Sequence, residues 1–145
     1  MTMKRLANAR GTALLEVALT LPLILLVSVS IFEFGRAYQT MQVLTNAARE
    51  GARVAVLPGL VAGAVQARVT SYLTAGQLPK ADTATVAVTT TQIAMGTATT
   101  TGTKVTVNYP FSFMVLQPVA RLVVGNSTLG SAFPMTAVAE MRNEQ

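Results

Sequence analysis

An apolar run near the N-terminus constrains this chain more than any other feature of its sequence. The run begins at Thr12 and ends at Phe32, and Glu16 is its only charged residue. As an α-helix its 21 residues would be about 31 Å long, because each residue adds 1.5 Å. The hydrocarbon core of a bilayer is about 30 Å thick. The run therefore predicts a transmembrane segment over residues 12–32.

The charges around this run predict how it is oriented. Lys4, Arg5 and Arg10 precede it and supply three of the five units of net positive charge. Basic residues beside a span stay on the cytoplasmic side. We therefore expect a single pass through the lipid bilayer, with a cytoplasmic N-terminus and an exported remainder. Since the excess charge is not spread over a folded region, we expect no nucleic-acid partner.

The composition argues against an enzyme. The chain has no His and no Cys, and its six carboxylates are scattered. This removes the commonest general base, every thiol nucleophile and the usual zinc ligands. The sequence has no phosphate-binding loop, no dinucleotide fingerprint and no paired-carboxylate spacing. We therefore expect no catalytic residue, no cofactor and no metal site.

Three interpretations of the N-terminal segment compete. It can be a secretory signal peptide cleaved after Ser30, within a small-x-small motif. It can be an uncleaved signal anchor. It can also be a prepilin-type signal, in which Gly11 ends a basic leader and Thr12 starts the mature chain. Glu16 favours the third, because a carboxylate deep in a span costs about 2.5–3.5 kcal/mol and a signal peptide gains nothing from it.

Four motifs occur in order within residues 10–53. They are RGTALLE at 10–16, LP at 21–22, EFGR at 33–36 and NAAREGAR at 46–53. Together they resemble the TadE-like family, minor pilins or pseudopilins of the tight-adherence (Flp-type) pilus system. Val17 departs from the family pattern, which usually has an aromatic residue after the glutamate.

The resemblance implies a pilin-like subunit of the bacterial inner membrane, with an exported domain that is periplasmic, extracellular or in the pilus, and a role in cell adhesion. It implies cleavage between Gly11 and Thr12 by a prepilin peptidase. Its further partners would be other pilin-like subunits and an inner-membrane assembly platform. Glu16 would neutralise the new α-amine of Thr12 on a neighbouring subunit. Pro22 would loosen the helix during extraction from the membrane, although membrane helices also tolerate proline routinely.

A helical seam continues beyond the apolar run. Apolar or small residues recur at alternating spacings of three and four, which predicts a helix extension over residues 33–57 that Pro58 and Gly59 end. The seam contacts either another subunit or the chain's own sheet. The candidate interface residues are Phe34, Met41, Leu44 and Ala48, with Arg49 and Arg53 on a neighbouring face.

Residues 58–145 are expected to form an exported α+β domain. Residues 60–75 predict a second helix, since Val61, Val65, Val69 and Leu73 recur every fourth residue. Residues 83–106 contain 11 threonines in 24 positions and predict strands, with turns at Gly96 and Gly102. Residues 110–124 predict a loop with a short helix or strand. Residues 129–141 predict a last strand, with Pro134 at an edge.

The predicted fold class is α+β: a long N-terminal helix (leader 1–11, span 12–32, extension 33–57), a second helix and an antiparallel sheet. The predicted function is a pilin-like subunit. Two alternatives remain open, a secreted binding domain released by signal peptidase and a membrane-anchored protein that never polymerises.

Overall fold

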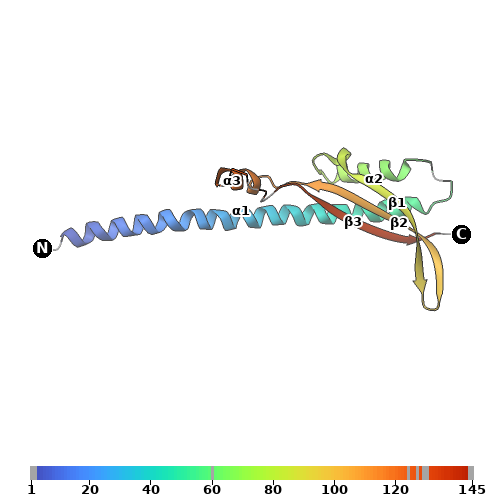
Figure 1. Cartoon of the computed structure of the whole chain (residues 1–145), viewed down its shortest axis with the longest axis horizontal. Coiled ribbons are helices and arrows are strands. Elements are labelled where there is room, and N and C mark those ends of the chain that lie inside the picture. The colour runs from blue at the N-terminus through green and yellow to red at the C-terminus, as the bar shows by residue number, and fades with distance from the viewer. Residues whose placement is uncertain (1–2, 60, 124, 127, 129–130, 144–145) are drawn as a thin grey trace.

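A single long helix runs along most of the molecule (Figure 1). In this computed structural model, α1 extends over Met3–Ala55, 53 residues, or about 80 Å. The structure describes residues 3–59, 61–123, 125–126, 128 and 131–143, and only the backbone of residues 3–10, 95, 98, 120, 122 and 123. The first half of α1 extends away from the rest of the chain, and the second half lies along the sheet. The predicted span and most of the predicted leader and extension thus lie on one helix, which ends at Ala55, two residues before the predicted end at residue 57; residues 1–2 of the leader lie outside the described residues.

The sheet has three antiparallel strands in the order β1-β2-β3. They are β1 (Thr85–Met95), β2 (Ala98–Phe111) and β3 (Phe133–Arg142). Gly96, with φ of 63°, forms the tight turn between β1 and β2, a backbone conformation that glycine adopts without strain. The threonine-rich segment therefore forms strands, as its β-branched residues predict.

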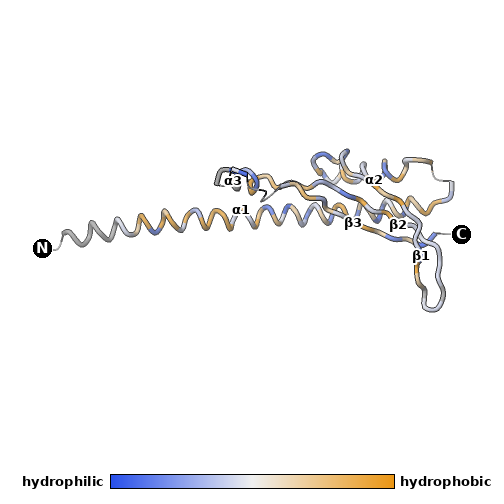
Figure 2. The backbone as a smooth tube through the Cα atoms, in the orientation of Figure 1, coloured by the Kyte–Doolittle hydropathy of each residue, from blue (hydrophilic) through white to orange (hydrophobic). Residues whose placement is uncertain are grey.

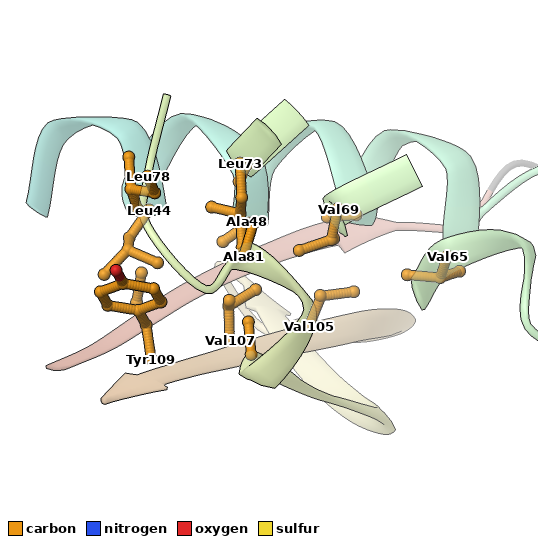
Figure 3. Close-up of a cluster of buried hydrophobic side chains, with 14 of the residues drawn as sticks. Leu44, Ala48, Val65, Val69, Leu73, Leu78, Ala81, Val105, Val107 and Tyr109 are labelled. Atoms are coloured by element: carbon orange, nitrogen blue, oxygen red, sulfur yellow. The ribbon is translucent and has the colours of Figure 1, made fainter. Parts of the chain in front are cut away.

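The core lies where α1, α2 (Ala64–Ala75) and one face of the sheet meet. Figure 3 shows side chains of both helices pointing toward β2. The short helix η1 (Ala81–Thr83) closes the same core beside α2. Alternate residues of β2 are buried, as expected for a sheet with one covered face. The largest apolar side chains that are fully buried are Phe111, Leu44, Leu73, Val69, Val105 and Val107. The predicted α+β class is confirmed.

Gly51 sets the distance between α1 and α2. A Cβ atom at this position would lie 2.7 Å from Cγ2 of Val69 and 3.3 Å from Cγ1 of Val105. Carbon atoms in contact normally lie about 3.5–4.0 Å apart. A side chain here would therefore push α2 away from α1, so the small residues of the seam serve the chain's own packing.

The second helix begins later than its apolar period predicts. It starts at Ala64, and Val61 lies before it and is exposed. Gly63 precedes the helix with φ of 82°, a left-handed conformation that does not continue a helix. The period is correct for Val65, Val69 and Leu73, which are all buried. Leu60, where the prediction placed the start, lies outside the described residues.

Two further boundaries differ from prediction. Gly102 is not at a turn but inside β2, paired with Thr91 on one side and Arg142 on the other. The last strand begins at Phe133, because residues 131–132 are not in a strand; residue 129, where the prediction placed the start, lies outside the described residues. Pro134 lies in the outer strand β3, opposite Pro110 of β2, as an edge position allows.

Residues 110–124 divide between strand and helix. Pro110 and Phe111 complete β2, a loop follows over residues 112–115, and α3 covers Leu116–Val123. Figure 1 shows α3 beside the first half of α1, beyond the end of the sheet. Leu116 and Val119 of this helix face the apolar part of α1.

Candidate functional site

The first half of α1 exposes an apolar surface. Figure 2 shows hydrophobic residues following one another along it. The helix from Gly11 is long and apolar enough to cross a membrane, with a mean hydropathy of 2.4 in its most apolar stretch, none of it buried. A core helix of a soluble protein can be as apolar, but it is mostly buried. The described part of the chain therefore leaves this apolar surface exposed.

The residues predicted for processing and assembly all lie on this exposed helix. Gly11, Thr12 and Glu16 are exposed, and Thr12 and Glu16 lie one turn apart on the same face. The hydroxyl of Thr20 donates a hydrogen bond of 2.8 Å to the backbone carbonyl of Glu16. Pro22 lies within the helix without interrupting it. Their proposed roles in cleavage and assembly remain predictions.

The predicted helix interface divides into two parts. Phe34 is 66% exposed and Met41 is 37% exposed, so both are available to another molecule. Leu44 and Ala48 are fully buried in the chain's own core. The second half of the seam thus packs on the chain's own sheet and second helix, which is one of the two interpretations that the sequence left open.

The arginines beside the seam are exposed, and one has a partner within the chain. Arg53 donates hydrogen bonds to both carboxylate oxygens of Glu50, at 3.0 and 2.7 Å. Arg68 of α2 lies 2.5 Å from the same carboxylate, so Glu50 joins the two helices. The hydrogen bonds from Arg53 and Arg68 lower the pKa of Glu50 to about 2. Arg49 is also exposed.

Glu33 forms a buried contact between α1 and the loop before α3. Its side chain is only 1% exposed. The backbone N–H of Val115 donates to Oε1 at 2.6 Å, and Arg36 donates to Oε2 at 3.1 Å. Arg36 also donates to the carbonyl of Ser112. We call Glu33, Arg36, Ser112 and Val115 the Glu33 clasp, because they fasten residues 112–115 to α1.

The clasp keeps its carboxylate ionised. Burial raises the pKa of Glu33, but the hydrogen bonds from Val115 and Arg36 outweigh burial and hold the pKa below its ordinary value. An ionised carboxylate is a strong acceptor for backbone N–H groups. The guanidinium of Arg36 lies 4.6 Å from the centre of the Phe111 ring, a cation–π distance. The clasp is therefore a charged contact in which the carboxylate is enclosed by protein atoms and the arginine is partly exposed.

An aromatic cluster adjoins the clasp. Phe111 and Phe113 meet edge to face with ring centres 5.3 Å apart, and Phe133 lies 5.6 Å from Phe111. Phe34 of α1 contacts Phe113 at 6.5 Å. These rings join α1, the end of β2 and the start of β3 at the level where the apolar run ends.

An apolar groove lies between α1 and α3. It has a volume of about 250 Å³, and its walls carry almost no polar surface. Leu116 and Val119 come from α3, and the opposite wall is one face of α1, where residues recur at helical spacing. The α1 residues of the groove are Pro22, Leu25, Leu26 and Val29.

Sequence reasoning missed the clasp and the groove. Glu33 and Arg36 lie three residues apart, the spacing of an ordinary ion pair on a helix surface, which is worth a few tenths of a kcal/mol. Only the long-range fold brings Ser112 and Val115 to that pair. The available signal was the position of Glu33 directly after the apolar run, where an unpaired carboxylate is costly.

The described residues contain no arrangement typical of metal binding, since no three of their carboxylates lie close enough together to hold an ion. The geometry instead combines an exposed apolar helix with a small domain that is fastened to the end of that helix.

Comparison with known proteins gives a match to a protein family. No curated protein and no solved structure matches this chain. A family model described as TadE-like protein matches residues 11–53, which cover the exposed apolar part of α1, the clasp residues Glu33 and Arg36, and the start of the buried seam. Residues 11–53 thus carry the sequence pattern of the TadE-like proteins, and the resemblance inferred from the four motifs is confirmed.

Proposed function

We propose that this chain is a pilin-like subunit, a minor pilin or pseudopilin, for assembly of a tight-adherence pilus. The observation that carries the proposal is where the family match falls. It begins at Gly11, the residue at which the predicted leader ends, and it covers the whole exposed apolar part of α1. A structural rather than a catalytic role is consistent with a chain that lacks both His and Cys.

The exposed apolar helix supports membrane anchoring before assembly. A span over residues 12–32 buries its side chains in lipid, and all of its backbone hydrogen bonds are internal to a helix. The basic residues before it place the N-terminus in the cytoplasm and the domain outside. A reporter enzyme that is active only in the periplasm, fused after Gln145, is expected to be active. Activity of a cytoplasmic reporter at that position would contradict this orientation.

The same helix supports assembly with other pilin-like subunits. Glu16 is exposed on α1, one turn from Thr12, and is therefore accessible to a neighbour. After cleavage by a prepilin peptidase, the α-amine of Thr12 on one subunit pairs with Glu16 of another. In this pair the negative charge of Glu16 and the positive charge of the α-amine compensate each other in a low-dielectric environment. The pair also fixes the axial offset between the two helices. An inner-membrane assembly platform would move the subunits.

Mass spectrometry of the mature N-terminus separates this proposal from its alternatives. A chain that starts at Thr12 supports processing by a prepilin peptidase. A start at Ile31 would identify a secreted domain, and an uncut chain that starts at Met1 would identify a permanent anchor. The matched variant is Gly11→Val, because the peptidase must fit a small residue before the cleaved bond. We expect Gly11→Val to remain full length, and normal shortening of this variant would contradict the proposal.

A further inference from the structure

The loop over residues 112–115 and α3 add a second apolar surface beside the predicted span. Met114 is 65% exposed and Val119 is 40% exposed, and both lie at the end of the domain nearest the apolar run. Phe32 and Phe34 of α1 are exposed at the same level. The apolar surface of α1 therefore continues onto an element that comes about ninety residues later in the chain.

The position of α3 along α1 gives its depth relative to the span. It faces the segment of α1 from Pro22 to Val29. At 1.5 Å per residue, Val29 lies about 4.5 Å and Pro22 about 15 Å along the helix from Phe32. Half of a hydrocarbon core is about 15 Å thick. If residues 12–32 cross the membrane, α3 lies beside the outer half of that span.

The Glu33 clasp satisfies part of the backbone that a position in lipid would remove from water. Irregular backbone is tolerated at membrane depth only where protein groups satisfy its hydrogen bonds. The carboxylate of Glu33 accepts the N–H of Val115 at 2.6 Å, and Arg36 donates to the carbonyl of Ser112. These two backbone groups of the loop are therefore already bonded, whereas Nε of Arg36 is buried and has no hydrogen-bond partner among the described residues.

The charge of the segment fits a phospholipid surface. Residues 112–123 contain no carboxylate, and Arg121 is their only charged residue. Arg121 is exposed beside Asn126 and Thr128, and a long basic side chain is attracted to anionic headgroups. A bilayer surrounds the span whenever the chain is inserted, whereas a second copy of the chain must first be recruited. These two facts favour lipid as the occupant of the groove.

We propose that the 112–115 loop and α3 form a second membrane-contacting element, which enters the outer leaflet beside α1 so that acyl chains cover Val119 and fill the groove. This inference rests on the proposed membrane anchoring of residues 12–32. It gives the domain two attachments to the bilayer, which set its height and rotation above the membrane surface before assembly.

Single cysteines test the inference cleanly, because the chain has no Cys of its own. The full chain carrying Val119→Cys is labelled with a fluorophore and reconstituted in vesicles of phosphatidylethanolamine and phosphatidylglycerol. Nitroxide lipids are expected to quench this label, and aqueous iodide is expected not to. Thr99→Cys, on the exposed hairpin between β1 and β2, is the aqueous control. Iodide quenching at Val119→Cys as strong as at Thr99→Cys would overturn the inference.

Leu23→Cys separates this inference from the proposed anchoring. Leu23 is exposed on the span itself, so lipid quenching there reports insertion of α1. If Leu23→Cys is quenched by lipid and Val119→Cys is not, only the second attachment is wrong. If neither is quenched by lipid, the anchoring is wrong as well. If Val119→Cys is shielded only at high protein density, the groove holds a second copy and the inference is overturned.

The clasp gives a further test with its own readout. Glu33→Gln removes the charge that holds the loop while keeping the shape of the side chain. We expect the label at Val119→Cys to shift from lipid quenching toward iodide quenching in this variant, while Leu23→Cys stays unchanged. Unchanged lipid quenching at Val119→Cys would show that the clasp does not hold α3 in the leaflet.

Discussion

The two halves of α1 differ in whether the rest of the chain covers their apolar side chains. In the second half, Leu44 and Ala48 are fully buried by α2 and the sheet of the same chain. In the first half, Leu14 is 73% exposed and Leu23 is 62% exposed. Both halves are equally helical, so the helix alone does not decide which residues are covered. The comparison shows that the chain's own fold covers the apolar side chains of the second half and leaves those of the first half exposed.

The two halves also differ in the surroundings of their glutamate side chains. Glu33 and Glu50 have arginine partners within the chain. Glu16 is exposed on the apolar surface, and its proposed partner belongs to another subunit. The predictions below test this division, beginning with the largest expected effect.

Glu16→Ala is expected to abolish assembly while leaving membrane insertion intact. Removing one partner of a buried ion pair costs roughly 3–5 kcal/mol, because the other charge remains unpaired. That corresponds to a loss of at least about a hundredfold in association. Crosslinking in membranes should show a variant that is inserted but no longer recovered with pilin-like partners. Recovery equal to the unmodified chain, with Thr12 confirmed as the mature N-terminus, would refute an intersubunit role for Glu16.

Leu44→Ala and Leu23→Ala form a matched pair across the two halves. Removing a buried leucine side chain costs about 2–5 kcal/mol, because it loses apolar burial and leaves a cavity. Leu44→Ala should therefore lower the free energy of unfolding of the domain by this amount, measured on the full chain in detergent. Leu23→Ala should leave that free energy unchanged. Equal losses from both substitutions would mean that the first half of α1 contributes to the domain's core.

Gly51→Ala and Gly35→Ala each add one methyl group to α1, the first at a crowded position and the second at an open one. A Cβ at Gly51 meets Val69 at 2.7 Å, whereas a Cβ at Gly35 meets nothing within 4 Å. Overpacking should make Gly51→Ala less stable by about 1–3 kcal/mol. Gly35→Ala should be more stable by roughly 0.5–1 kcal/mol, since alanine favours a helix. Thermal unfolding of both variants measures the difference, and a stabilising Gly51→Ala would show that α2 does not lie this close to α1.

The smallest effect expected is the pH dependence of the contact between α1 and α2. The pKa of Glu50 is lowered from 4.5 to about 2 by Arg53 and Arg68. A carboxyl whose pKa is lower in the folded state stabilises that state above its unfolded pKa. This contribution is present above pH 4.5 and is lost as the pH falls toward 2. Unfolding temperatures of the full chain and of Glu50→Gln should therefore converge over this window. A constant difference down to pH 2 would exclude Glu50 as the titrating group.

Several features could be predicted from residue patterns because they depend on local physics. The apolar run from Thr12 specifies a helix that water does not solvate. The alternation of Val105 and Val107 with polar residues specifies a strand with one covered face. The four motifs within residues 10–53 gave the resemblance to the TadE-like proteins, whose family model matches residues 11–53. Gly63 and Gly102 show the limit of local patterns, because one glycine caps a helix and the other lies inside a strand between close neighbours.

The sequence alone determined that this chain has a long apolar helix, an α+β domain and a TadE-like N-terminal region, because hydrophobic period, turn residues and motifs act over a few neighbouring positions. Only the tertiary structure decided which half of the seam is covered and what Glu33 contacts. Val115 reaches Glu33 across 82 positions of the chain. No local pattern records such a contact, since its free energy depends on burial and on a hydrogen-bond partner that the folded sheet brings into place.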